Sequence, residues 1–304
     1  MTMPTWIWIP IILVAAAAQT VRNTAQRSLT KSAGTLAATC VRFLYGLPFA
    51  LLGLLAVHAS AQPSLPSASV SFAVWISIGA VGQLGGTAFL LAAMEQRSFI
   101  VAVAYSKTEV LQVALLSVLL LHDPVSLQTG FAILLAMTGV IVLSVKGAST
   151  RTSSPASWFS PTALLGLASG AGFAISAVGF RAAVLALGAF PAWLAGLYGL
   201  VWAQAIQTTL LCGYLALRNR NALLQIIVSW RVSLIAGLAG AFASMCWFTA
   251  FALRSAADVR TLGLVEVLYG YAASSWIFHE RTTGREAVGI VLLLIGIIIV
   301  AAQW

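Results

Sequence analysis

Long apolar segments separated by short polar breaks form the main pattern of this 304-residue chain. A helix needs about 20 mostly apolar residues to cross the hydrocarbon core of a bilayer. The pattern therefore predicts ten spans, near residues 5–21, 35–57, 71–94, 98–121, 125–145, 161–187, 190–217, 232–253, 256–278 and 284–302. A membrane β-barrel would instead show alternating segments of about ten residues. We therefore expect an all-α integral membrane protein with ten transmembrane helices.

Composition and charge support this class. Hydrophobic residues make up 61% of the chain and charged residues only 8%, whereas a soluble domain carries about 25% charged residues. The net charge of +9 comes from scattered residues and not from a dense patch, so no nucleic-acid partner is expected. In a membrane protein, Lys and Arg instead mark cytoplasmic loops. The expected environment is the lipid bilayer of the plasma (inner) membrane, which the chain would cross many times.

The longest polar linker, residues 145–161, divides the predicted spans into five and five. When the chain is shifted by 157 residues, EVLQVALLSVLLLHD falls on EVLYGYAASSWIFHE, so that Glu109 meets Glu266 and Asp123 meets Glu280. Residues 1–147 and 158–304 are therefore predicted to be two five-helix repeats. Because five is odd, the second repeat starts on the opposite side of the membrane. The two copies are expected to be inverted, as is typical of transporters.

The same residues carry a resemblance to a known family. The chain resembles EamA-type transporters of the drug/metabolite transporter superfamily in three features. A second acid follows Glu109 after thirteen residues, the second copy reads LVEVLYGYAASSWIFHE, and Arg42 lies in CVRFLYGLP. The sequence departs from the family pattern at Val110 and Val267, where Pro is common. The resemblance implies ten helices, a central cavity and export or exchange of small metabolites, without naming the substrate.

Charged residues near the middle of two spans are the main candidates for a functional site. Lys107 and Glu109 lie in the span 98–121, and Glu266 lies in the span 256–278. A charge at the bilayer centre costs about 2.5–3.5 kcal/mol on insertion scales, so it must face the bundle interior, pair, or line a wet cavity. Lys107 is two residues from Glu109 and points to nearly the opposite side, so another helix must supply its partner. Alternatively, both acids are structural and are paired within the bundle.

Helical geometry adds neighbours to the two acids. Residues three and four apart share one face of a helix. Tyr105 and Gln112 are therefore expected on the same face as Glu109, and Tyr269 on the same face as Glu266. We expect both faces to be turned toward the centre of the bundle.

Two further residues are candidates that also have structural interpretations. Arg42 is either a structural anchor or a cavity residue, with neither role favoured. Trp247 is by default a membrane-belt or packing residue, and a place in a cavity wall is the alternative. Arg260 and Asp258 are expected near the membrane interface. The expected substrate-binding residues are thus Glu109, Glu266, Lys107, Tyr105, Gln112, Tyr269, Arg42 and Trp247.

No cofactor or metal is expected. The sequence holds neither a GxxxxGK[ST] phosphate-binding loop nor the HExxH pattern of metalloproteases. ATP therefore does not drive the protein directly. The three cysteines, Cys40, Cys212 and Cys246, show no metal-binding spacing and are interpreted as small apolar packing residues.

These observations favour a secondary active transporter with alternating access around a midplane cavity. It would export or exchange a small polar or amphipathic metabolite such as an amino acid, with protons as a candidate coupling ion. One alternative is a membrane-embedded enzyme, which would need a convergent nucleophile, base or metal ligands. The other is a structural subunit of a membrane complex, which would gain nothing from paired acids in the middle of the membrane.

The distribution of basic residues predicts the orientation. Numbered from the N-terminus, the odd loops carry eleven Lys and Arg residues, and the even loops carry Arg181 and Arg254, with Arg260 as a third at most. The positive-inside rule puts the odd loops in the cytoplasm and both termini outside, whereas the resemblance implies cytoplasmic termini. We expect cysteines introduced beside Arg218 and Arg220, in a chain without its native cysteines, to resist an impermeant thiol reagent added to intact cells. Rapid labelling would contradict this orientation.

Overall fold

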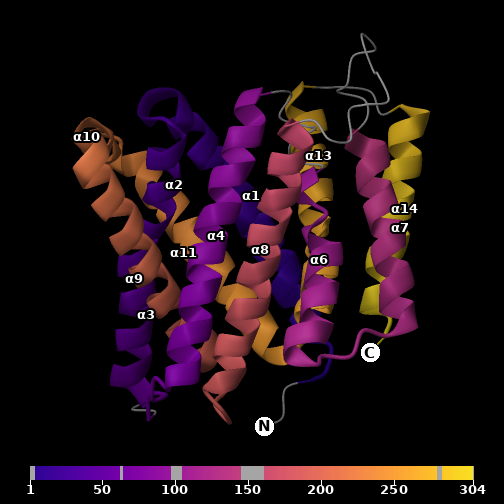
Figure 1. The fold of residues 1–304 in the computed structure, drawn as a ribbon, viewed down its shortest axis with the longest axis horizontal. Coiled ribbons are helices and arrows are strands. Elements are labelled where there is room, and N and C mark those ends of the chain that lie inside the picture. The colour runs from indigo at the N-terminus through magenta and orange to yellow at the C-terminus, as the bar shows by residue number, and fades with distance from the viewer. Residues whose placement is uncertain (1–3, 62–63, 97–104, 145–160, 279–282, 304) are drawn as a thin grey trace. The chain divides into compact units, whose positions relative to one another are not determined.

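The computed structural model describes residues 4–61, 64–96, 105–144, 161–278 and 283–303 (Figure 1). These residues form helices joined by turns and short connections, and they include no strand, which confirms the all-α prediction for this part of the chain. The helices are α1 (Trp8–Ala33), α2 (Thr35–Leu44), α3 (Gly46–Ala61), α4 (Val70–Gln96), α6 (Glu109–Leu116), the π-helical turn η1 (Ser117–Leu121), α7 (Leu127–Ser144), α8 (Pro161–Ala186), α9 (Ala192–Arg218), α10 (Arg220–Val228), α11 (Trp230–Leu253), α12 (Ala256–Leu262), α13 (Val265–Phe278) and α14 (Gly284–Ala301).

Several of these helices have the length and the apolar composition to cross a membrane, and each coincides with a predicted span. Shorter apolar stretches at Glu109–Leu121 and Leu127–Leu143 coincide with two more. The prediction of several membrane-spanning helices is confirmed, and the count of ten stays a prediction. Within the described residues, the six long stretches are Thr35–Ser60, Val70–Ala93, Pro161–Ala186, Ala192–Arg218, Trp230–Leu253 and Gly284–Ala301.

Two helices differ from the sequence pattern. Helix α1 continues to Ala33, twelve residues beyond the predicted end of the first span at residue 21. Its Gln26 amide donates to the Ala38 carbonyl oxygen of α2 (2.8 Å), which holds the polar extension against the next helix. Helix α10 is not predicted by the sequence pattern, because the polar residues of LRNRN, residues 217–221, indicate a break between two spans. The Asn219 side chain accepts from the backbone N–H of Ala222 (3.1 Å) and so caps the start of a new helix.

Helix boundaries recur at the same 157-residue offset that relates the two halves of the sequence. The stretch made of α2 and α3 covers residues 35–61, and α9 covers residues 192–218. Helix α7 covers residues 127–144, and α14 covers residues 284–301. Helices α4 and α11 end at Gln96 and Leu253, again 157 residues apart. The repeat seen in the side chains is therefore also a repeat in where helices begin and end.

The chain forms two compact units, whose boundaries fall within α1, α4 and α8 and between α11 and α12. Each unit contains helices from both halves of the sequence, so the compact units are not the predicted repeats. Unit 1 is made of Met1–Ile9, Gly82–Val178 and Ser255–Trp304, and unit 2 is made of Pro10–Val81 and Gly179–Arg254.

Close packing of α7 against α14 forms much of the core of unit 1, and Figure 1 shows the two helices side by side. A Cβ atom added at Gly139 would lie 2.6 Å from the Gly289 carbonyl oxygen, and one at Gly296 would lie 2.7 Å from the Ala132 carbonyl oxygen. The missing side chains let the two backbones approach closely, as small residues do in membrane proteins. Glycines have the same effect between α4 and α8, because a Cβ at Gly172 would lie 2.5 Å from the Gly86 nitrogen.

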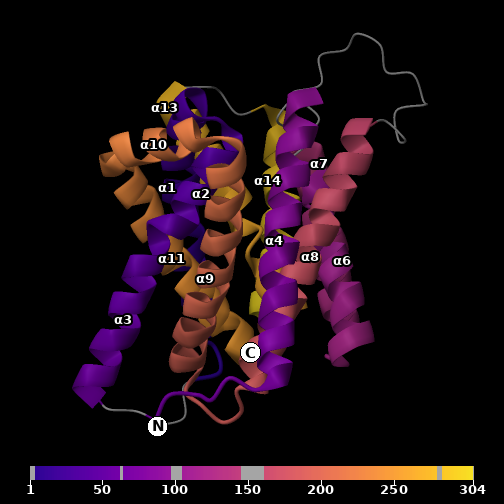
Figure 2. The ribbon, with the colours of Figure 1, turned by 60° about the vertical axis from the view of Figure 1, so that its left-hand side comes forward.

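In unit 2, α9 packs against α2, α3 and α11, and Figure 2 shows α9 beside α2. A Cβ atom at Gly237 of α11 would lie 2.5 Å from Cβ of Tyr45, the residue between α2 and α3. The Tyr45 hydroxyl donates to the Ile226 carbonyl oxygen of α10 (3.3 Å). The Phe180 and Phe248 rings, with centroids 4.5 Å apart, join α8 to α11. Unit 2 is therefore held by apolar and aromatic packing around α9 and α11.

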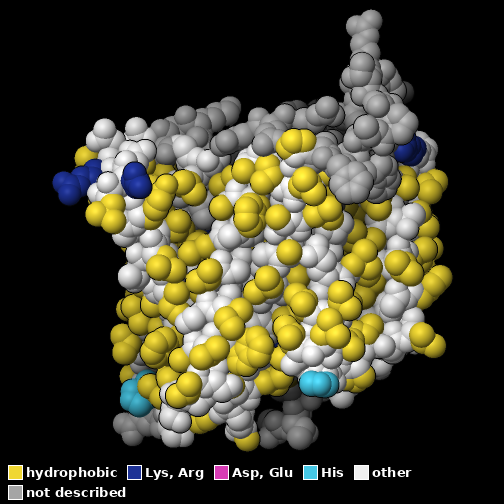
Figure 3. All heavy atoms as spheres, in the orientation of Figure 1, with side chains coloured by type: hydrophobic (Ala, Val, Ile, Leu, Met, Phe, Trp, Pro, Cys, Tyr) yellow, Lys and Arg dark blue, Asp and Glu magenta, His cyan; other side chains and the backbone are white. Residues whose placement is uncertain are grey.

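Charge is divided unequally between the units. Unit 1 contains all seven acidic residues and seven basic ones, and unit 2 contains nine basic residues and no Asp or Glu. The outer surface is apolar: Leu127 is 95% exposed and Leu217 is 86% exposed. Hydrophobic side chains are spread over the described part of the face in Figure 3, and the basic side chains visible there lie near its upper edge, on the left beside α10 and on the right. An apolar surface of this extent indicates a lipid environment, since soluble monomers rarely expose large apolar patches.

The contact between α7 and α14 generates a stability prediction. The Gly139→Ala variant would place its methyl group against the α14 backbone, and we expect overpacking to cost about 1–3 kcal/mol. Thermal unfolding of the purified protein in detergent, followed by tryptophan fluorescence, should show a lower Tm. The matched control is Gly130→Ala in the same helix, because a Cβ there would meet no described atom within 4 Å. Equal Tm values for the two variants would contradict this account of the packing.

Candidate functional site

The helix that carries Glu109 is interrupted immediately before this residue. Lys107 and Thr108 form a turn, and α6 begins at Glu109. The Tyr105 carbonyl oxygen accepts both from the backbone N–H of Thr108 (3.2 Å) and from its hydroxyl (2.7 Å). A threonine hydroxyl that bonds to a nearby carbonyl competes with regular helical bonding. The sequence pattern did not predict this interruption within the apolar span 98–121.

The second copy is interrupted at the equivalent place. Helix α12 ends at Leu262 and α13 begins at Val265, with Gly263 and Leu264 in a turn between them. The backbone N–H of Glu266 donates to the Gly263 carbonyl oxygen (3.1 Å), a bond three residues back in place of the usual four. The acids of both copies therefore lie in the first turn of a helix. The helix macrodipole favours a negative charge at that end.

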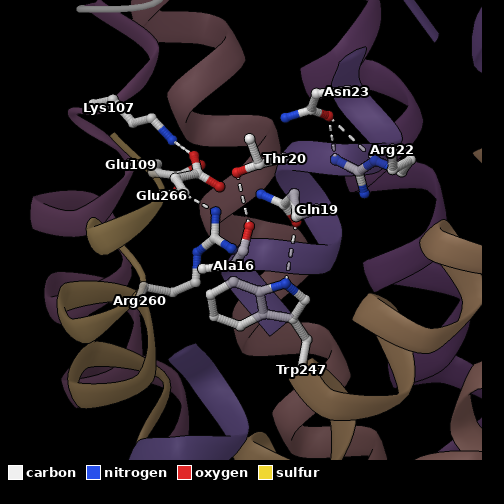
Figure 4. A network of polar contacts seen from close by, with 10 residues as sticks. All are labelled: Ala16, Gln19, Thr20, Arg22, Asn23, Lys107, Glu109, Trp247, Arg260 and Glu266. Atoms are coloured by element: carbon white, nitrogen blue, oxygen red, sulfur yellow. Dashed lines mark hydrogen bonds and ion pairs between the residues drawn. The ribbon is translucent and has the colours of Figure 1, made fainter. Parts of the chain in front are cut away.

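Two ion pairs join the interrupted segments within unit 1 (Figure 4). The Lys107 ammonium pairs with Glu266 Oε1, and the Arg260 guanidinium pairs with Glu109 Oε1. The acid of each half of the sequence is thus paired with a base from the other half. The partner of Lys107 comes from another helix, as the sequence predicted. The alternative that both acids are paired within the bundle also agrees with this geometry.

Burial makes these pairs different from surface salt bridges. The Glu109 side chain is only 5% exposed, and the other three charged side chains are at most 18% exposed. Exposed ion pairs contribute little to stability, whereas removing one partner of a buried pair strands the other charge in a medium of low dielectric constant. The two ion pairs therefore hold the two interrupted segments against each other. To separate the paired side chains, water or another group of opposite charge must replace the lost partner.

Gln112 connects the interrupted segment to α8. Its side-chain amide donates to the Thr108 hydroxyl oxygen (3.1 Å) and to the Leu167 carbonyl oxygen (3.4 Å). A Cβ atom at Gly170 would lie 2.9 Å from Gln112 Nε2 and 2.9 Å from Thr108 Oγ1. Gly170 thus lets α8 lie directly against the turn that precedes Glu109. In this structure Gln112 positions the turn.

The two candidate tyrosines flank the same interruptions. Tyr105 precedes the turn in the first copy, and Tyr269 follows Glu266 by three residues in α13; both are half-buried. Tyr105, Glu109 and Gln112 were expected on one face of a single helix. Glu109 and Gln112 both lie in α6, but the turn at Lys107 and Thr108 separates Tyr105 from that helix. Glu280, the expected counterpart of Asp123, lies outside the described residues.

Arg42 and Trp247 belong to unit 2. Arg42 is buried in α2, and its guanidinium carbon lies 4.7 Å from the centroid of the Phe43 ring. The Trp247 indole N–H of α11 donates to the Gln19 side-chain oxygen of α1 (3.1 Å, Figure 4). The structure therefore brings together the charged candidates of unit 1, and the candidate roles of Arg42 and Trp247 stay predictions.

Arg260 is the site residue that sequence reasoning missed. It was expected near the membrane interface, and the structure instead pairs it with buried Glu109. A signal was available in the charge count. The spans 98–121 and 256–278 contain two deeply placed acids, Glu109 and Glu266, and their basic residues are Lys107 and Arg260. If Lys107 pairs across to Glu266, charge balance leaves Arg260 for Glu109.

Comparisons with known proteins agree with this fold. Residues 6–145 match the model of the EamA-like transporter family. A crystal structure with a similar fold aligns over 97% of this chain and 98% of its own, with a TM-score of 0.69 and 16% sequence identity. It is among 29 chains of solved structures that match. No curated protein matches the sequence.

The crosswise pairing predicts a thermodynamic coupling. Because a stranded buried charge costs about 3–5 kcal/mol, we expect Arg260→Gln to lower the Tm of the purified protein more than the exposed control Arg220→Gln does. The double variant Arg260→Gln/Glu109→Gln leaves no stranded charge from that pair. It should lose less stability than the sum of its two single variants. Strictly additive losses in a double-mutant cycle would show that the two residues do not interact.

Proposed function

Since residues 6–145 match the model of the EamA-like transporter family, we propose that this chain is a secondary active transporter that exports or exchanges a small polar or amphipathic metabolite such as an amino acid. The observation that carries the proposal is the crosswise pairing of four buried charges at two interrupted helices. Interrupted helices with paired charges are typical of transporter binding sites, because their ends provide fixed partial charges within the membrane.

The proposed architecture has ten spans arranged as two inverted five-helix repeats, residues 1–147 and 158–304, in the plasma (inner) membrane. The 157-residue recurrence of helix boundaries supports the repeat. So do the two interruptions, each placed beside the equivalent acid. Alternating access would then be a movement of segments that the two ion pairs hold together in one state.

The paired charges suggest how substrate could drive that movement. A zwitterionic amino acid carries an ammonium group that can take the place of Lys107 or Arg260 as the ion-pair partner of an acidic side chain. Its carboxylate can likewise take the place of Glu109 or Glu266 as the partner of a basic side chain. Binding would therefore open the ion pairs without stranding a buried charge, and release would close them again. The charges pair with each other across the two halves of the sequence, which favours transport over an enzymatic role.

Protons are a candidate coupling ion in this scheme. Protonation of Glu109 or Glu266 would remove the negative charge that holds its basic partner, so a proton and a cationic substrate group would compete for the same carboxylate. The proton would be loaded on one side of the membrane and given up to substrate on the other. A Na⁺-free flux assay at different pH gradients tests this step separately from substrate binding.

Transport in proteoliposomes tests the proposal. The probes are radiolabelled amino acids, measured by efflux and by counterflow. We expect Glu109→Gln and Glu266→Gln to reduce flux at least tenfold and to remove its response to a pH gradient. The double variant Lys107→Gln/Glu266→Gln strands no charge from that pair, so it should be more stable than Glu266→Gln and still fail to transport. This variant separates loss of the site from loss of the fold.

Asp258→Asn in α12 is the matched control. Asp258 accepts a hydrogen bond from the Thr129 hydroxyl (3.2 Å), and an asparagine oxygen can accept the same bond, so near-normal flux is expected. If folded Glu109→Gln and Glu266→Gln proteins moved substrate at the wild-type rate and with the wild-type pH dependence, the acids would be structural and this mechanism would be wrong.

A further inference from the structure

Two cysteines from different halves of the sequence meet within unit 2. Cys40 lies in α2 and Cys212 in α9, and their Sγ atoms are 3.3 Å apart. Cys40 is fully buried and Cys212 is half-buried. In the reduced state one thiol donates a weak hydrogen bond to the other. The sequence interpretation of both residues as simple packing residues did not anticipate this contact.

We propose that Cys40 and Cys212 form an oxidation site, at which a disulfide bond closes between α2 and α9. A disulfide has an S–S length near 2.05 Å, so the two sulfur atoms need to approach by only about 1.3 Å. Small rotations of the two side chains can supply that movement. Cys246, in α11, is the third cysteine of the chain and provides an internal reference.

The position of the pair along its helices suggests the oxidant. Cys40 lies five residues after the start of α2 at Thr35, and Cys212 lies six residues before the end of α9 at Arg218. At 1.5 Å per residue, Cys40 and Cys212 are about 7.5 and about 9 Å along the helix axis from these helix ends. A small, uncharged hydroperoxide can penetrate that far, whereas a large charged disulfide such as oxidised glutathione is a poor fit.

The chemistry balances with a hydroperoxide as the oxidant. The more exposed sulfur, Cys212, attacks the peroxide O–O bond and becomes a sulfenic acid, and water leaves when hydrogen peroxide is the reagent. The Cys40 sulfur then attacks Cys212 Sγ, the S–S bond forms, and the sulfenic hydroxyl leaves as a second water with the thiol proton. Two thiols and one hydrogen peroxide thus give one disulfide and two waters, and the two electrons pass from sulfur to peroxide oxygen.

The bond would have a defined structural consequence. It would join residues 172 positions apart in the chain and would fix α2 to α9 inside one compact unit. The ion pairs of the candidate site lie in the other unit, so this proposal does not depend on the transport mechanism.

Mass spectrometry on the full-length protein in liposomes tests the proposal. The protein is treated with hydrogen peroxide, free thiols are blocked with N-ethylmaleimide, and the unreduced digest is searched for the peptide that links Cys40 to Cys212. We expect this linked peptide to appear while Cys246 is still modified by N-ethylmaleimide. The number of alkylated cysteines should therefore fall from three in the untreated protein to one after oxidation. Dithiothreitol should restore all three. Oxidation should also raise the Tm, and the reductant should reverse the increase.

Variants make the assignment specific. Cys246→Ser should form the link as the wild type does, and Cys40→Ser or Cys212→Ser should abolish both the link and the reversible increase in Tm. Because the main comparison is made within the wild-type protein, a variant that fails to fold does not remove the test. The proposal is overturned if Cys40 and Cys212 both stay alkylated at peroxide concentrations that oxidise Cys246. It is equally overturned if the disulfides found are mainly between molecules or involve Cys246.

Discussion

The pairing of buried charge is the constraint on which the candidate site depends. Lys107, Glu109, Arg260 and Glu266 are all largely withdrawn from solvent, and each would be costly there without a counter-charge. The structure meets this requirement crosswise, with each acid taking its base from the other half of the sequence. One consequence is mechanical, because the two pairs tie together residues 159 and 151 positions apart in the chain. The other is chemical, because only a ligand with charge of its own can separate them cheaply.

Basic residues in unit 2 meet a different requirement, since that unit contains no acidic residue. Among their contacts are neutral hydrogen-bond acceptors and the rings of Phe43 and Trp230. The Arg22 guanidinium donates to the Asn23 side-chain oxygen (2.7 Å), and Arg181 donates to the backbone carbonyl oxygens of Phe251 and Arg254. Arginine suits this use, because its planar guanidinium presents several donors at once. Neutral hydrogen-bond acceptors therefore take part in accommodating the basic residues of unit 2.

Glycine placement determines how closely the helices of each unit can approach. Gly139 and Gly289 remove the side chains that would keep α7 from α14, and Gly170 does the same where α8 meets the turn before Glu109. In lipid, apolar side chains gain little by leaving one apolar surface for another, so close backbone contact and satisfied polar groups carry more of the packing. The apolar residues that dominate the composition therefore set the environment of the protein, while a small number of glycines set its contacts.

The sequence alone determined the helical class, the membrane environment and the 157-residue repeat, because hydropathy and charge are local properties that survive without tertiary structure. It also selected Glu109, Glu266 and Lys107, since an ionisable residue within an apolar span is conspicuous. Only the tertiary structure decided that the two helices are interrupted beside these acids, since a Thr–carbonyl bond and a glycine turn leave no break in hydropathy. Only it assigned Arg260 to Glu109. Partners distant in the chain are chosen by packing, which no local pattern encodes.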